Sequence, residues 1–115
     1  MYQIVKFLFP FADNLAKSKP RPALVISPAF GKHKQIVLAY ITTDSKDLLQ
    51  TDILLESSKQ YFSSTGLNVD SVIKLHRLIT VTPSQIGESI GTLPDEIVPK
   101  VKKKLLKVFM LKSNP

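Results

Sequence analysis

The sequence predicts one small, mostly β domain with a C-terminal α-helix, folded as a small barrel. Three observations favour this class. Short runs of β-branched and aromatic residues, separated by turn residues, recur over the first 82 positions. Strands and helices do not alternate, which argues against a doubly wound sheet. The 115 residues suffice for one hydrophobic core. We expect a single domain over residues 1–112 and a frayed tail over 113–115.

Five or so strands are expected before residue 83. The apolar runs that predict them are residues 3–9, 22–27, 35–43 and 53–55, followed by 69–75 and 78–82, which form one bent strand or two short ones. The run 35–43 is the longest of high β propensity. In the polar stretch 57–66, Tyr61 and Phe62 are expected to be packing anchors.

Two helices are expected after the strands. Thr82-Pro83-Ser84-Gln85 combines a hydroxyl cap, a proline at the first helical position and a glutamine at the capping-box position. This predicts a first helix that ends near Gly91 and has Ile86 and Ile90 on its apolar face.

The last helix is expected to begin near residues 94–96, with its long part starting at Pro99. One apolar face is predicted from Val101, Leu105, Val108 and Phe109, with Lys102, Lys103, Lys104 and Lys107 mostly outside it.

Charge and cysteine content limit the function classes. The net charge of +7 should attract phosphates, anionic membranes or an acidic protein. With no cysteine, disulfides, thiolate zinc sites and cysteine nucleophiles are excluded, which fits a reducing compartment. The apolar start of the chain is too short to span a bilayer and lacks the basic region of a signal peptide. We therefore expect a cytoplasmic protein that does not insert into a membrane.

Standard catalytic motifs are missing from the sequence. It contains no P-loop, GxGxxG, HExxH or GxSxG pattern. His33 and His76 are far apart and have no carboxylates at metal-ligand spacing. We expect neither a metal site nor a cofactor.

Polar residues at the ends of apolar strands are the remaining candidates. Arg21 precedes Pro22, which favours an extended backbone and could present the guanidinium group to a phosphate. Thr42 and Thr43 end a strand on opposite faces, so only one of them can share a pocket with Arg21. Lys74 and His76 share a strand face, where a cation beside an imidazole suits phosphate binding and proton transfer. Each residue has a plainer interpretation, as a surface ion pair, a strand former or an exposed strand face.

Several segments, taken in order, resemble one known family. They are Phe9-Pro10-Phe11-Ala12-Asp13, Lys19-Pro20-Arg21-Pro22-Ala23-Leu24-Val25-Ile26-Ser27, Ile41-Thr42-Thr43, Thr65-Gly66-Leu67, Asp70-Ser71-Val72-Ile73-Lys74 and Ile90-Gly91-Thr92-Leu93. Together they resemble the MazF/PemK family of toxin endoribonucleases. The Arg-Pro strand is the most specific part of the match.

The resemblance implies an SH3-like small β-barrel of the MazF/CcdB type, a homodimer, an antitoxin with an acidic docking segment, and metal-independent cleavage of single-stranded RNA. It makes Arg21 and Thr42 active-site residues. Some members carry Arg-x-Asp where this chain has Lys74-Leu75-His76, so His76 is the candidate base, or its presence signals an altered specificity. Further RNA-binding residues are expected to be Asp13, Lys17, Lys19, Thr43, Lys46, Lys74 and Arg77.

Two other functions fit the same sequence. CcdB-like proteins share this barrel and inhibit gyrase through protein contacts, without RNA chemistry. A non-catalytic nucleic-acid-binding barrel would also suit the positive charge. Arg21 and Thr42 favour the nuclease over both alternatives.

Overall fold

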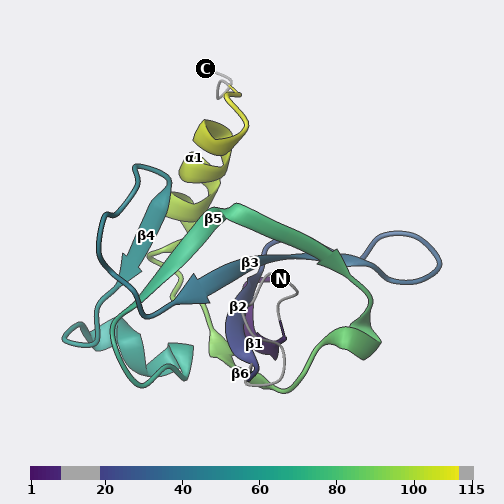
Figure 1. Cartoon of the computed structure of the whole chain (residues 1–115), viewed down its shortest axis with the longest axis horizontal. Helices are drawn as coiled ribbons and strands as arrows, with labels where there is room; N and C mark the ends of the chain where they lie inside the picture. Colours follow the sequence, from purple (N-terminus) through teal and green to yellow (C-terminus); the bar gives the residue numbers. More distant parts are fainter. Residues whose placement is uncertain (9–18, 112–115) are drawn as a thin grey trace.

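A six-stranded antiparallel sheet forms the body of the molecule. The computed structural model describes residues 1–8 and 19–111, and the strands and helices below are those of these residues. The sheet has the order β4-β5-β3-β2-β1-β6 and curls into a half-barrel (Figure 1). Its strands are β1 (Gln3–Phe7), β2 (Arg21–Val25), β3 (Ile36–Thr42), β4 (Asp52–Leu55), β5 (Ser71–Val81) and β6 (Ser89–Thr92), with the 3₁₀ turns η1 (Gln60–Thr65) and η2 (Pro83–Gln85) and the helix α1 (Val98–Val108). The prediction of a mostly β fold with a C-terminal helix is confirmed.

The sheet is apolar on both faces. The larger core lies on the face that α1 covers, and its central members are Ile4, Leu24, Ile41, Leu55, Ile73, Leu75 and Val101. A smaller cluster on the other face contains Val5, Phe7, Ala23, Val25, Leu38 and Val81. Strands buried on both faces read as continuous apolar runs, which is why β2 and β3 were recognisable.

The helix α1 docks on the larger core through one stripe. Val101 is fully buried, while Leu105 and Val108 pack against the core at partial burial. Pro99 lies in the first turn, where its missing N–H costs no helical hydrogen bond. Phe109 does not belong to this stripe: it follows the helix and is 55% exposed. None of the described helices is long and apolar enough to cross a membrane.

The prediction of a first helix that ends near Gly91 is wrong. Its capping box forms, with the Gln85 side chain accepting from the Thr82 N–H at 2.8 Å, but only the short turn η2 follows. The chain then runs along the free edge of β1. The Gly87 N–H donates to the Lys6 carbonyl at 2.7 Å, and the Lys6 N–H donates to the backbone carbonyl of Glu88 at 3.0 Å. Pairing with β1 satisfies these backbone groups and outweighs the local helical signal, so the chain forms β6 instead of a helix.

Strand β5 is one bent strand rather than two. Ala39 of β3 faces Leu78, whereas the next residue, Tyr40, faces Lys74. Residues 75–77 therefore have no partner on β3, and the strand bends sharply there, as strands do at bulges. Before the bend, β5 also pairs with the short strand β4, which forms one edge of the sheet.

The segment between β4 and β5 is held by the predicted aromatic anchors. Phe62 is buried, and Tyr61 packs against the core while its hydroxyl accepts from the Glu56 N–H at 3.2 Å. The domain boundary at residue 112 and the frayed tail lie at or beyond the end of the described residues.

Candidate functional site

An open groove lies where β3 ends beside the bend of β5, and the loop 44–51 forms its outer wall. Its volume is about 530 Å³, and the residues that line it are Tyr40, Thr42, Asp44, Lys46, Asp47, Leu49, Lys74, His76 and Arg77. Three cationic side chains, two carboxylates, an imidazole and two hydroxyl groups thus face one space. Such a set can bind a phosphate and move a proton beside it.

The bend of β5 determines which side chains face the groove. Leu75 turns into the core and is fully buried. Its neighbours Lys74, His76 and Arg77 line the groove. A regular strand would send alternate residues to opposite faces. The three extra residues at the bend bring His76 and the adjacent Arg77 to the same space.

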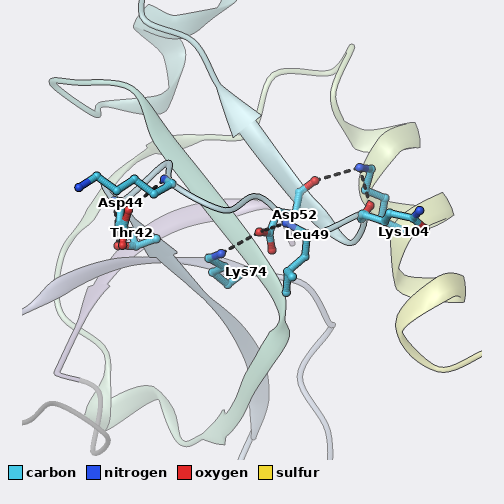
Figure 2. A network of polar contacts seen from close by, with 8 residues as sticks. Thr42, Asp44, Leu49, Asp52, Lys74 and Lys104 are labelled. Atoms are coloured by element: carbon cyan, nitrogen blue, oxygen red, sulfur yellow. Dashed lines mark hydrogen bonds and ion pairs between the residues drawn. The ribbon is translucent and has the colours of Figure 1, made fainter.

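Thr42 is fixed at the point where β3 passes into the loop. Its hydroxyl oxygen accepts from the Asp44 N–H at 3.2 Å, and the Asp44 carboxylate accepts from the Lys46 N–H at 3.0 Å (Figure 2). These bonds form a tight turn directly after the strand. Because the oxygen is used as an acceptor there, the hydroxyl proton of Thr42 can still be donated to a ligand.

Two of the cations are held by neighbours. The Lys74 ammonium group lies 2.7 Å from the Asp52 carboxylate in an ion pair that is largely shielded from solvent. The Arg77 guanidinium carbon lies 5.4 Å from the centre of the Tyr40 ring, within cation–π range. Both contacts reduce the freedom of long side chains that would otherwise move in solvent.

Arg21 lies on β2, the strand next to β3, and outside the groove lining. It is exposed at the first position of β2, opposite Phe7 of β1. The β2–β3 register pairs Ala23 with Tyr40, and this register continued by two residues would put Arg21 opposite Thr42. Arg21 is therefore on the sheet face of Thr42 but is not among the residues that line the groove.

The other predicted site residues divide into three groups. Lys46, Lys74 and Arg77 line the groove together with Thr42 and His76. Thr43, next to Thr42 in the chain, and Lys19, two residues before Arg21, are exposed and do not line the groove. Asp13 and Lys17 lie outside the described residues.

Sequence reasoning missed five residues around the groove: Tyr40, Asp44, Asp47, Leu49 and Asp52. Asp52 carried a signal, as an acidic residue directly before the apolar run Ile53-Leu54-Leu55. Its partner Lys74 is 22 positions away, and nothing in the sequence specifies the register that joins them.

Comparison with known proteins identifies the family. The profile of the PemK-like, MazF-like toxins of type II toxin-antitoxin systems matches residues 2–109. The chain belongs to this toxin family. The resemblance seen in the sequence is thereby confirmed. A comparison with curated proteins finds no match.

Solved structures of mycobacterial toxins share the fold of this PemK/MazF-like toxin. The Mycobacterium tuberculosis toxin MazF-mt6 superposes with a TM-score of 0.72 at 21% identity, over 96% of this chain and 99% of that one. A mycobacterial endoribonuclease in complex with its cognate antitoxin gives 0.69 at 14% identity, over 98% and 96%. A further mycobacterial endoribonuclease gives 0.68 at 14% identity, over 98% and 92%. The predicted MazF-type fold is confirmed.

Proposed function

We propose that this toxin is an endoribonuclease that cuts single-stranded RNA at selected sequences without a metal ion. The observation that carries the proposal is the groove, in which Thr42, Lys74, His76 and Arg77 come together from β3 and the bend of β5. Family membership supports the same activity, since solved proteins of this fold are described as endoribonucleases.

RNA needs little from such a site because it carries its own nucleophile, the 2′-hydroxyl group. In the proposed reaction, the 2′-oxygen forms a bond to phosphorus while the bond to the 5′-oxygen breaks. His76 accepts the proton of the 2′-hydroxyl group, and Thr42 donates a hydrogen bond to the phosphate. Arg21, on the neighbouring strand β2, stabilises the phosphorane charge and donates a hydrogen bond to the leaving 5′-oxygen, which takes its proton from water. The products are a 2′,3′-cyclic phosphate and a 5′-hydroxyl end.

The surrounding charges are proposed to bind the rest of the RNA. Lys46 and Arg77 lie on two sides of the groove, one from the loop and one from β5. Thr43 and Lys19 extend the polar surface toward β2, and Asp13 and Lys17 are proposed to contribute from the preceding segment. The same basic surface suits an acidic antitoxin segment. We propose that the toxin acts in the cytoplasm as a homodimer that this antitoxin inhibits.

The test is cleavage of total RNA by the purified protein in excess chelator, with the ends of the fragments identified chemically. We expect cuts at a short defined sequence, with cyclic phosphate and 5′-hydroxyl ends. Arg21→Ala should lower kcat/KM by about 10²- to 10³-fold, the usual loss when a donor to the developing charge is removed. Lys102→Ala, an exposed change on the outer side of α1, is the matched control and should cleave like the wild type.

Three results would contradict the proposal. One is intact RNA after incubation with folded wild-type protein, and another is a set of 5′-phosphate ends. The third is an Arg21→Ala variant that keeps full growth inhibition, which would favour the gyrase-type mode of CcdB-like proteins.

A further inference from the structure

A buried carboxylate lies directly behind the groove. The Asp52 side chain is only 1% exposed, and it faces Lys74 across the β4–β5 pairing. Its Oδ2 atom accepts from the Lys74 ammonium group at 2.7 Å and from the Leu49 N–H at 2.8 Å. The other oxygen, Oδ1, is buried without a hydrogen-bond partner among the residues that the structure describes. One carboxylate oxygen thus holds both a residue that lines the groove and the end of the loop that walls it (Figure 2).

Stability alone does not account for this arrangement. Burying two charges costs solvation free energy, and an apolar pair of the same size is often as stable or more so. What the pair does supply is position: Lys74 faces Tyr40 on one side and Asp52 on the other, so that its ammonium group has a defined place beside the groove.

The helix α1 holds the same segment from the other side. The Lys104 ammonium group donates to the carbonyl oxygens of Gln50 at 2.7 Å and of Asp52 at 2.9 Å. Lys104 therefore fixes the backbone of Asp52 while Lys74 fixes its carboxylate. The two contacts can be broken separately, which allows the role of the carboxylate to be isolated.

We propose that Asp52 is a positioning residue of this toxin, which acts on RNA through Lys74. Asp52 directs the Lys74 ammonium group so that it contacts a substrate phosphate in the groove, and it keeps the loop 44–51 against the groove. The inference rests on the proposed ribonuclease function and adds a buried residue to the site. Asp52 itself does not touch RNA.

The experiment is a double-mutant cycle with Asp52→Asn and Lys74→Met. Asparagine keeps an oxygen that can accept the Leu49 N–H but removes the charge that pairs with Lys74. Three readouts are measured: kcat and KM on a short RNA containing the cut site, binding of the same oligonucleotide with a 2′-deoxy nucleotide at that site, and the melting temperature. Lys104→Met is the matched control, since it loosens the same segment and leaves the ion pair intact.

We expect each single variant to lower kcat/KM by about 10- to 100-fold. Lys74→Met removes the group that contacts the phosphate, and Asp52→Asn misplaces it, where a shift of about 1 Å can cost this much. In the Lys74→Met background, Asp52→Asn should change kcat/KM by less than about 2-fold, since non-additivity marks two residues that act as one unit. Lys104→Met should lower the melting temperature but reduce kcat/KM much less than Asp52→Asn does.

Several results would overturn the inference. The losses of the two single variants could multiply in the double variant, Lys104→Met could cost as much activity as Asp52→Asn, or Asp52→Asn could leave kcat/KM unchanged. If the wild type cleaves no RNA, the proposed function fails and the binding readout decides the inference. Weaker binding by Asp52→Asn only when Lys74 is present would then support positioning, whereas unchanged binding, or no binding by the wild type, would refute it.

Discussion

Gly91 of β6 should be one of the least replaceable residues of the scaffold, and Gly91→Ala tests this. A Cβ atom there would overlap the carbonyl group of Thr65 and would come within 2.5 Å of the Ser64 carbonyl oxygen, where ordinary contact begins near 3.4 Å. These are backbone atoms at the end of η1, so no side-chain rotation can relieve the overlap.

The cost follows from the displacement that alanine would require. β6 must move by about 1 Å, and it is an edge strand paired only with β1, at Gln3, Ile4 and Val5. Overpacking costs about 1–3 kcal/mol, and weakening one or two ladder hydrogen bonds adds about 1 kcal/mol each. We expect a loss of about 3 kcal/mol in the free energy of unfolding. For a chain of this size that lowers the melting temperature by about 12 °C.

Thermal unfolding followed by circular dichroism measures the effect, with Gly31→Ala as the matched control. Gly31 has a φ of +73°, but nothing lies within 4 Å of its Cβ position. Alanine there should cost only the left-handed backbone penalty, about 1 kcal/mol. A Gly91→Ala variant that melts within about 2 °C of the wild type, or no lower than Gly31→Ala, would refute the close approach of β6 and η1.

Three further predictions concern the helix, the site and pH. Val101→Ala removes two fully buried methyl groups from the contact between α1 and the core, so the free energy of unfolding in urea should fall by about 2 kcal/mol. Thr42→Val keeps the shape of the side chain but removes its hydroxyl, so kcat/KM on RNA should fall by about 10²-fold. Loss of the exposed bond from the Asp44 N–H should lower the free energy of unfolding by only about 1 kcal/mol, so the variant should still be folded at the assay temperature. Hydrogen bonds from the Ser57 side chain and backbone lower the pKa of Asp70 below its ordinary 3.8. The charged form of Asp70 therefore stabilises the fold above that value, and the contribution is lost as the pH falls through the lowered pKa. Asp70→Asn should accordingly melt below the wild type at neutral pH, and the two curves should converge in acid; a constant difference would contradict this assignment.

Local signals were sufficient for most of the strands. The runs over 22–27 and 35–43 contain the residues of β2 and β3 that are buried on both faces of the sheet, and the structure places β3 inside its run and begins β2 one residue before its run, at Arg21. The signal failed at Thr82-Pro83-Ser84-Gln85. A capping box describes how a helix begins, but the edge of β1 determined what followed it, and that edge is about 80 residues away in the sequence.

The groove could be predicted only in part for a similar reason. Thr42 and His76 each end or interrupt an apolar run, which made them visible in the sequence. Their meeting depends on the bend of β5, where three residues have no partner on β3. A period-two pattern assigns His76 and Arg77 to opposite faces, so it could not bring both to one groove. Asp52 was hidden because its importance comes from a cross-strand partner, and register is a property of the sheet rather than of either strand.

The motifs that carry the family resemblance have two different physical roles. Thr65-Gly66-Leu67 and Ile90-Gly91-Thr92-Leu93 are separate in the sequence, yet a Cβ atom on Gly66 would overlap the backbone of Ile90, and one on Gly91 would overlap that of Thr65. Because each glycine has no Cβ atom, the backbone of the other motif can pack directly against it, and the two motifs together hold β6 against η1. The segments containing Arg21, Thr42 and Lys74 instead lie at or near the groove. A substitution in the glycine pair should therefore reduce activity only as far as it reduces the folded fraction, whereas substitutions at Thr42 or Lys74 should reduce it in protein that is fully folded.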